Sequence, residues 1–369
     1  MKVLNDVTYV AQYWNLTTFD LWEEVSGSSF FTTANQHRAL AQATQVATAL
    51  NTSCTACESQ APEILCFLNS AYWNGNYIDA NINITANRSG LDSNTVLASI
   101  SVFDINAPCS SETFQPCSSY SLANFKALTD SFRPIYAINS AAIGVGSAVA
   151  VGRYPEDIYY GGNPWYLATL ACAEFLYDAV AQWNTQKSLT VDSTSISFFQ
   201  DLDSSVKAGT YASSSSEFTT LTTAATSYAD AFVSVVETYV PTNGSLSEQF
   251  NRTTGYPLSA YDLTWSFASF VTMSQRRAGT FPLSWGAANI QSAPSKCIGG
   301  GVEGTYTVAQ AAESGQASST ATGTSGGSAS GTGTGPASAT TTKSGAVATF
   351  ALDYLYLLVL GVFAAVLSF

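Results

Sequence analysis

Residues 216–240 read SEFTTLTTAATSYADAFVSVVETYV, and this stretch decides the class of fold. Phe218, Leu221, Ala225 and Tyr228 recur every three or four positions, which places them on one face of an α-helix. Comparable segments predict further helices at about 30–50, 59–72, 93–103, 121–139, 163–186, 194–205 and 259–277. Regular strand alternation is scarce, so the sequence predicts an all-α domain with long loops.

The composition is that of a weakly charged, acidic protein. Of its 369 residues 46% are hydrophobic, enough for a sizeable core in one large domain or two ordinary ones, and only 11% are charged. The formal net charge of −13 excludes nucleic acid as an expected partner, because phosphates require a basic face. An acidic, aromatic-rich chain suits neutral sugars, which stack on rings and form hydrogen bonds.

Histidine and cysteine usage argue against a metal site. His37 is the single histidine and lies within a helical pattern, so we assign it a structural role. Cys54-x-x-Cys57 alone would suit a redox or zinc motif, but no second CxxC and no nearby histidine accompany it. We therefore expect no metal and no cofactor. Cys172 lies in an apolar run and is expected to be a buried free thiol.

Several features indicate a secreted glycoprotein. The chain has seven cysteines and few charges, and disulfides persist outside the cytosol. It also contains six N-x-Ser/Thr sequons, which are expected glycosylation sites. These lie at Asn15, Asn51, Asn83, Asn87, Asn243 and Asn251.

The two ends of the sequence differ in kind. The first ten residues lack the apolar stretch of a signal peptide, which suggests that the start of the protein is absent. Residues 315–345 are almost entirely Gly, Ser, Thr, Ala and Pro, as in an extended stalk. Small residues 344–346, a spacer and the apolar run 354–369 fit a signal for a GPI anchor. A transmembrane helix is the alternative, although about 16 apolar residues are short of the roughly 20 it needs. We expect an extracellular or cell-surface location.

Three segments hold residue types that suit acid–base chemistry and sugar binding. Phe19–Val25 places three carboxylates beside a tryptophan, and such crowding favours one carboxyl that stays protonated as a general acid. The simpler alternative is a solvated acidic turn. Val151–Trp165 combines glycines, aromatics and one arginine, which resembles the lip of a sugar site or else a rigid connector. Asn243–Phe250 holds a lone glutamate and, by itself, reads as a surface loop.

Together, five segments in a fixed order closely resemble the fungal glucoamylases of glycoside hydrolase family 15, from about residue 4 to about residue 297. They are Tyr13-Trp14-Asn15 with Asp20-Leu21-Trp22-Glu23-Glu24-Val25, Ser59-Gln60-Ala61-Pro62-Glu63-Ile64-Leu65-Cys66, Gly152-Arg153-Tyr154-Pro155-Glu156-Asp157, Gly244-Ser245-Leu246-Ser247-Glu248-Gln249, and Leu258-Ser259-Ala260-Tyr261-Asp262-Leu263-Thr264-Trp265-Ser266. The resemblance implies an (α/α)6 barrel with about eight of its twelve helices present. It also implies a monomer that releases β-D-glucose from starch, glycogen and malto-oligosaccharides by inverting hydrolysis of α-1,4 and, more slowly, α-1,6 bonds.

The resemblance also implies roles for individual residues. Glu23 would be the general acid and Glu248 the general base, with their carboxyls roughly 6.5–9.5 Å apart to admit a water molecule. Ser259 would hydrogen-bond the base. The remaining implied substrate-binding residues are Asp20, Trp22, Glu24, Arg153, Tyr154, Tyr159, Trp165 and Trp265. The implied disulfides are Cys54–Cys57, Cys66–Cys297 and Cys109–Cys117.

The sequence departs from the family pattern at both ends. No starch-binding domain follows the stalk, and the family's N-terminal third, which supplies part of the sugar-gripping surface, is missing. We therefore expect a catalytic domain over 1–300, a linker over 301–345 and a hydrophobic tail over 346–369. The alternative function is a cell-surface protein that binds glycan, or serves in the wall, without turnover.

Overall fold

The computed structural model describes residues 2–142, 144, 146–284, 286 and 292–297, all within one compact unit that spans Met1–Ala309. The expected linker 301–345 and tail 346–369 lie outside the described residues. The described α-helices are α1 (Lys2–Tyr13), α2 (Phe30–Ala49), α3 (Thr55–Ala71), α4 (Asn94–Ser101), α5 (Ser119–Phe132), α6 (Tyr166–Gln186), α7 (Ile196–Leu202), α8 (Ser216–Tyr239) and α9 (Thr264–Arg277). Short 3-10 turns are η1 (Ser111–Thr113), η2 (Ala137–Ala142) and η3 (Tyr159–Gly161).

Short antiparallel strands connect the helices. The strands β1 (Thr18–Phe19), β2 (Ser26–Ser29) and β3 (Asn81–Ile82) form one small sheet in that order. Two further antiparallel pairs complete the strands described, β4 (Ser188–Val191) with β5 (Gly209–Ala212) across α7, and β6 (Gln249–Phe250) with β7 (Pro257–Leu258). The fold is mainly helical, as the amphipathic patterns predicted.

Several predicted helix boundaries differ from the observed ones, two of them for clear local reasons. The helix predicted over 121–139 ends at Phe132, since Pro134 has no N–H to continue it. The helix predicted over 259–277 begins only at Thr264, because Ser259 and Asp262 have left-handed φ values of 65° and 50°. The helix predicted from residue 163 begins at Tyr166, and α1 was not among the predicted ranges.

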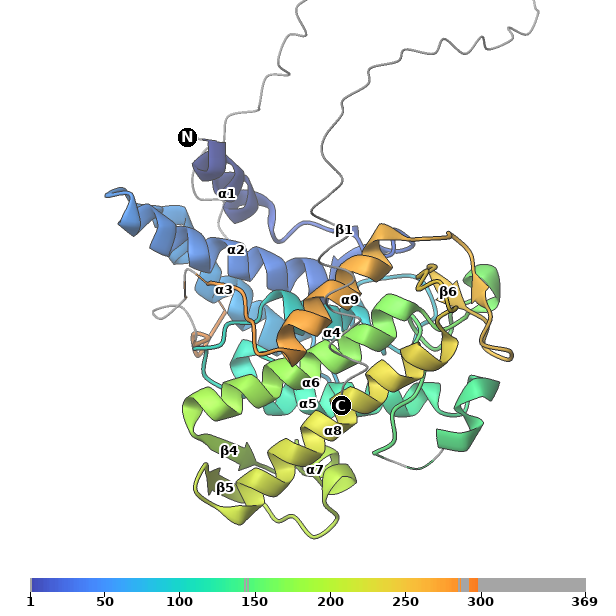
Figure 1. The fold of residues 1–369 in the computed structure, drawn as a ribbon. Helices are drawn as coiled ribbons and strands as arrows, with labels where there is room; N and C mark the ends of the chain where they lie inside the picture. Colours follow the sequence, from blue (N-terminus) through green and yellow to red (C-terminus); the bar gives the residue numbers. More distant parts are fainter. Residues whose placement is uncertain (1, 143, 145, 285, 287–291, 298–369) are drawn as a thin grey trace, which may run out of the picture. The chain divides into compact units, whose positions relative to one another are not determined.

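Helix α6 forms the centre of the fold. It packs against α8 on one side and α9 on another, with α4 also in contact, and these helices lie together in Figure 1. Sixteen of its residues are buried, so the helix is apolar almost all round. Cys172 lies on it as a fully buried free thiol, which confirms the prediction for this residue, and burial raises its pKa.

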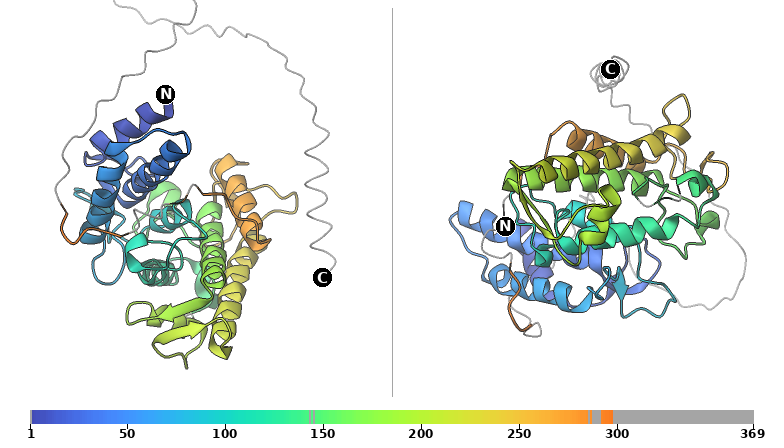
Figure 2. Two further views of the ribbon diagram at one scale, coloured as in Figure 1. Left: turned by 90° about the vertical axis from the view of Figure 1, so that its left-hand side faces the viewer. Right: turned by 90° about the horizontal axis from the view of Figure 1, so that it is seen from below.

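The apolar side chains form two clusters. One is centred on α6 and α8, and the other lies among α1, α2 and α3. Both groups of helices are visible on the left of Figure 2, with α4 in contact with α2 and α6 between them. Tyr166 Oη donates to the carbonyl of Tyr239 at 2.7 Å, which ties the start of α6 to the end of α8. The loops described below converge on this end.

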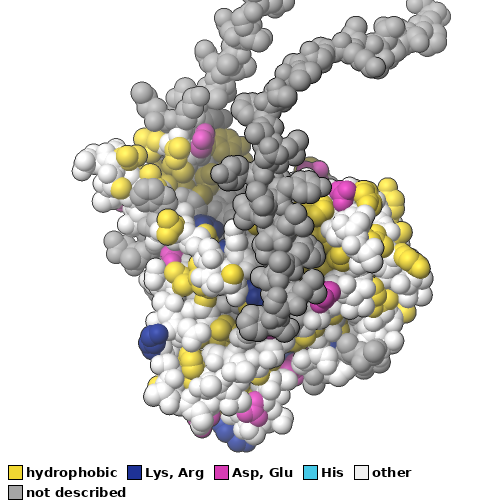
Figure 3. All heavy atoms as spheres, viewed as in Figure 1, with side chains coloured by type: hydrophobic (Ala, Val, Ile, Leu, Met, Phe, Trp, Pro, Cys, Tyr) yellow, Lys and Arg dark blue, Asp and Glu magenta, His cyan; other side chains and the backbone are white. Residues whose placement is uncertain are grey.

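Disulfides join the three implied pairs, Cys54–Cys57, Cys66–Cys297 and Cys109–Cys117. Cys66–Cys297 links positions 231 residues apart and fastens α3 to the last described segment. The face drawn in Figure 3 carries few, scattered charged side chains, in keeping with the low charged fraction of the chain. Within the described part of the chain, no helix has both the length and the apolarity needed to cross a membrane.

Candidate active site

A tight loop between β1 and β2 presents the first carboxylates. The strands pair Phe19 with Ser26, so residues 20–25 form the connection. Asp20 organises it, because its Oδ1 accepts the backbone N–H of Glu24 at 2.8 Å and that of Val25 at 3.2 Å. Glu23 adopts a left-handed φ of 58° and is exposed. Among the described residues, its carboxylate has no hydrogen-bond or ion-pair partner, which leaves it free for a ligand.

Arg88 holds this loop from the side. Its guanidinium lies 3.3 Å from Asp20 Oδ2 and 2.7 Å from Glu24 Oε2. It also stacks over the ring of Tyr154, 3.9 Å from the centroid. These contacts fix two carboxylates of the loop while leaving Glu23 unpaired.

A second guanidinium joins the loop to the segment that begins at residue 152. Arg153 makes a bidentate pair with Asp157 at 2.8 and 2.7 Å, and its Nη2 lies 2.8 Å from Glu24 Oε1. Burial alone would lower the pKa of Arg153, but the hydrogen bonds and charges of the two carboxylates outweigh it and raise the pKa. Among the described residues, its Nη1 group makes no hydrogen bond or ion pair and retains two donors for a ligand.

Glu24 is the shared acceptor of these groups. Tyr154 Oη donates to its Oε2 at 2.5 Å, and both Arg88 and Arg153 pair with the carboxylate. Burial alone would raise the pKa of Glu24, but the Tyr154 hydrogen bond and the two guanidinium charges lower it. Glu24 therefore stays ionised and cannot donate a proton at ordinary pH.

Aromatic rings surround the charged groups. The Trp22 ring lies 5.7 Å from that of Trp165 and 5.8 Å from that of Trp265, while Tyr159 lies 6.4 Å from Trp165. Trp22 and Trp165 are buried, whereas Trp265 and Tyr159 are 38% and 41% exposed. The Nε1 group of Trp165 is buried without a hydrogen-bond partner. Such a wall suits the apolar faces of a sugar ring, with one indole N–H available for a hydroxyl.

Glu248 lies immediately before β6, more than 200 residues further along the chain than the β1–β2 connection. Ser259 Oγ donates to its Oε1 at 2.6 Å, and Gln249 Nε2 donates to the same oxygen at 2.9 Å. The Glu248 N–H donates to the Ala260 carbonyl at 2.8 Å. One carboxylate oxygen is thus held by two donors, which orients the other.

The three segments meet at one place. Trp165 forms a β-bridge with Gln249, and Trp22 contacts both Trp165 and Trp265. The charge of Glu248 also acts on the Tyr159 hydroxyl. Every site residue proposed from the sequence belongs to one of these contacting segments, namely Asp20, Trp22, Glu23, Glu24, Arg153, Tyr154, Tyr159, Trp165, Glu248, Ser259 and Trp265.

The sequence model of glycosyl hydrolases family 15 matches residues 1–275. The chain belongs to this family. Glucoamylase P of Amorphotheca resinae is 57% identical over 320 residues, and a glucoamylase of Neurospora crassa is 54% identical over 309. These matches cover 86% and 84% of this chain but 52% and 49% of the relatives, so the chain spans about half their length.

Solved family 15 structures resemble this chain over the same extent. The glucoamylase of Hypocrea jecorina matches with a TM-score of 0.78 at 55% identity, and that of Hormoconis resinae with 0.79 at 58%. Each match covers 82% of this chain, and 50% and 52% of the respective relatives. The all-α, (α/α) barrel-type fold predicted from the sequence is thereby confirmed.

Three residues of this family 15 site were not proposed from the sequence. Arg88 and Asp92 contact the 20–25 loop across more than sixty residues of sequence, at separations of 68 and 70. No local motif marks Asp92, and Arg88 stands out in the sequence only as the middle residue of the Asn87 sequon. Asp157 lies within the quoted Arg153 segment, and its spacing of four residues from Arg153 was the available signal.

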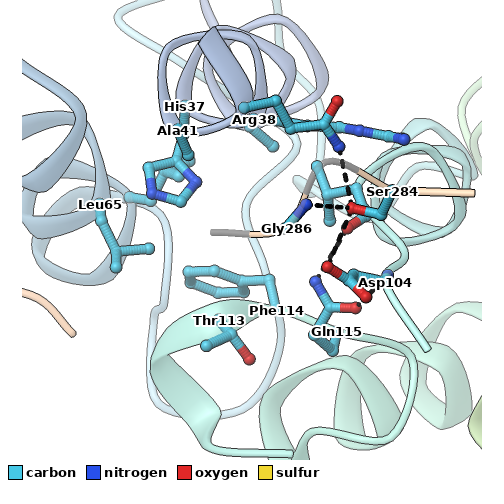
Figure 4. Close-up of a pocket in the computed structure, with 14 residues that line it drawn as sticks. His37, Arg38, Ala41, Leu65, Asp104, Thr113, Phe114, Gln115, Ser284 and Gly286 are labelled. Atoms are coloured by element: carbon cyan, nitrogen blue, oxygen red, sulfur yellow. Dashed lines mark hydrogen bonds between the residues drawn. The ribbon is translucent and has the colours of Figure 1, made fainter. Parts of the chain in front are cut away.

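A hollow elsewhere in the structure is separate from this site. Figure 4 shows it between α2, α3 and the segments around Asp104, Phe114 and Ser284, with a volume of about 40 Å³. His37 lines it, but none of the proposed site residues does. Its single carboxylate, Asp104, already accepts a hydrogen bond from Ser284 at 2.9 Å. The hollow therefore offers no acid–base pair.

Proposed function

We propose that this family 15 chain is an inverting exo-glycosidase. It would hydrolyse terminal α-1,4 and, more slowly, α-1,6 glucosidic bonds of starch, glycogen and malto-oligosaccharides, with release of β-D-glucose. The observation that carries the proposal is the contrast between two carboxylates on meeting segments. Glu23 is unpaired and free to approach a ligand, whereas Glu248 is held by two donors to one oxygen. The names of the glucoamylase relatives support the substrate class.

In this proposal the two carboxyls divide the chemistry. Glu23 protonates the glycosidic oxygen as the bond to C1 breaks, and the sugar becomes oxocarbenium-like. Glu248 takes a proton from a water molecule that attacks C1 from the opposite face, so the configuration inverts. Ser259 and Gln249 keep the second oxygen of Glu248 directed at that water. Space for the water requires the two carboxyls to lie roughly 6.5–9.5 Å apart.

The remaining groups bind the sugar. Glu24 accepts hydroxyls, and the two spare donors of Arg153 reach the terminal glucose. Asp20 fixes the loop through two backbone hydrogen bonds. The proposed aromatic contacts to the sugar come from Trp22, Tyr154, Tyr159, Trp165 and Trp265. The ionised cluster also favours the positive charge that develops on the sugar ring.

The decisive experiment measures glucose release from maltose and soluble starch. We expect Glu23→Gln and Glu248→Gln each to lower kcat by at least about 100-fold. Glu217→Gln, at the exposed start of α8, is the matched control and should leave kcat unchanged. Proton NMR of fresh product should show the β-anomer first. Equal activity in all four proteins, or the α-anomer first, would overturn the mechanism.

A second candidate function is glycan binding without turnover. The observation in its favour is the cluster of aromatic rings around Trp22, which can bind a sugar whether or not Glu23 and Glu248 act on it. Calorimetric titration with maltoheptaose separates the two functions. Binding with no glucose released over a day supports the second, whereas release that requires Glu23 and Glu248 supports the first.

We also propose that the protein is a secreted, monomeric glycoprotein tethered to the cell surface by a GPI anchor. Five of the six sequon asparagines are exposed, and Asn251 is half-buried. The anchor signal falls on residues outside those described. Release from intact cells by a phosphatidylinositol-specific phospholipase supports the anchor, whereas retention through that treatment and release only by detergent favours a transmembrane tail.

A further inference from the structure

Asp92 is a buried carboxyl that the proposed chemistry does not use. It is 2% exposed and accepts the Trp22 indole N–H with both oxygens, at 2.9 and 3.1 Å. Its Oδ1 also accepts the backbone N–H of Asn94 at 2.8 Å. Burial of a carboxyl costs free energy unless hydrogen bonds compensate, so this acceptor is expected to have a specific task.

Trp22 connects this acceptor to the reactive loop. It is the residue before Glu23, and its ring enters the core between Trp165 and Trp265. The neighbouring rings restrain movement of the indole perpendicular to its plane. The hydrogen bonds from its N–H to Asp92 restrain movement of the indole within that plane. Since adjacent Cα atoms are a fixed distance apart, a displaced Trp22 would displace Glu23 with it.

The charge state of Asp92 is compatible with this contact. Burial raises the pKa of its carboxyl to about 7, while Arg88 acts to lower it and Asp20 to raise it. Below that pH the carboxyl is neutral and still has a carbonyl oxygen that accepts a hydrogen bond. The carbonyl oxygen of an asparagine side chain can accept the same hydrogen bond.

We propose that Asp92 is a positioning residue, which holds the Trp22 indole and thereby keeps the 20–25 loop in the conformation that presents Glu23 to the substrate. The expected effect on kcat rests on the proposed function. The positioning itself is a property of the ligand-free protein and can be measured there.

The competing explanation is that Asp92 only begins α4. Its Oδ1 accepts the N–H two residues on, as a capping side chain does. Asp104 offers a matched comparison, because its Oδ1 accepts the N–H of Asn106 in the same way at 2.9 Å. Asp104 is also buried, but within the described part of the chain its hydrogen bonds go to residues outside the 20–25 loop. A role limited to this local hydrogen bond predicts similar consequences for both residues.

The kinetic test compares Asp92→Ala, Asp92→Asn and Asp104→Ala. A displacement near 1 Å at a reacting group costs on the order of 100-fold in rate. We therefore expect Asp92→Ala to lower kcat about 100-fold with KM within about threefold, since the sugar-binding groups remain. Asp92→Asn should restore kcat to within about threefold, and Asp104→Ala should leave it unchanged. Equal kcat in all four proteins, or equal loss in both alanine variants, would overturn the proposal.

Hydrogen exchange tests the positioning without relying on turnover. The amides of Glu24 and Val25, which donate to Asp20, should exchange at least about tenfold faster in Asp92→Ala than in the wild type and Asp92→Asn. Trp22→Phe should have the same effect and add nothing in the Asp92→Ala background. Unchanged exchange overturns the positioning even if the enzyme is active. A wild type that releases no glucose but shows the faster exchange in Asp92→Ala instead refutes the proposed function and supports the positioning.

Discussion

At the scale of single residues, the site is a balance of opposite charges around one unpaired carboxylate. Asp20, Glu24 and Asp157 are neutralised only in part by Arg88 and Arg153. The sequence could predict the members that lie in compact motifs. It could not predict Arg88, because its partners are 64 and 68 residues away in the chain and only the folded β1–β2–β3 region brings them together.

The depressed pKa of Glu24 predicts how its contribution to stability depends on pH. A carboxyl whose pKa is lowered by folding stabilises the protein above its ordinary value of 4.5, and this stabilisation is lost as pH falls through the folded value. Glu24→Gln should therefore have a melting temperature a few degrees below the wild type at pH 6, and the gap should narrow as pH falls below 4.5. A gap that widens in acid would contradict the assignment. Differential scanning calorimetry measures it.

Asp92 predicts the opposite dependence on pH. Its pKa rises from 3.8 to about 7 on folding, so its stabilisation is complete below about pH 4 and is lost as pH rises through 7. Relative to Asp92→Asn, the wild type should lose up to about 4 kcal/mol between pH 4 and pH 8, at about 1.4 kcal/mol per pKa unit. Urea unfolding of both proteins at the two pH values tests this. A constant difference would show that Asp92 does not titrate in this range.

At the scale of elements, the helices followed from apolar periodicity, whereas the loops that carry the site did not. Periodicity continued through Ser259 and Asp262, but left-handed φ values there end the helical pattern and place Ser259 beside Glu248. Asn163 precedes a proline and resembles a helix cap. Its amide instead donates to the Tyr160 carbonyl and to Gln249 Oε1, contacts that depend on a distant hairpin.

Substitutions at two neighbouring glycines test whether the backbone conformation of the η3 turn, which carries Tyr159, requires glycine. Both have positive φ, 92° at Gly161 and 66° at Gly162. A Cβ at Gly162 would lie 1.9 Å from the carbonyl oxygen of Asp157, whereas nothing lies within 4 Å of one at Gly161. Gly161→Ala should cost about 1 kcal/mol, and Gly162→Ala clearly more together with a rise in KM, because Asp157 orients Arg153. Equal effects on urea unfolding and KM would refute the account.

At the scale of the whole molecule, the sequence predicted the fold class, and the three disulfides followed from the family resemblance. The helix ranges predicted from periodicity did not include α1, whose apolar face joins the cluster with α2 and α3. The separation of the core into two clusters was also not predicted, since periodicity shows which face of a helix is buried but not against which partner.

The disulfides should differ in their contribution to stability. In the chain-entropy model the separation of 231 residues at Cys66–Cys297 corresponds to about 5 kcal/mol, and that of 8 residues at Cys109–Cys117 to about 2.5 kcal/mol. Replacing both cysteines of the first pair by serine should therefore lower the free energy of unfolding by about twice as much as the same change in the second. Denaturant unfolding of the two variants compares them, and the reverse order would contradict the prediction.

The Cys66–Cys297 bond also makes the backbone between these residues a covalent ring. A protease that cuts once inside the ring opens it without dividing the molecule, so the chain keeps its mass until a reductant is added. Only a second cut within the ring releases a fragment. That fragment is then joined to the rest of the chain neither by a peptide bond nor by the Cys66–Cys297 disulfide. At the proposed cell-surface location, a nick by a protease in the loops around Tyr160 or Asn243 would leave both carboxylate-bearing segments on one molecule.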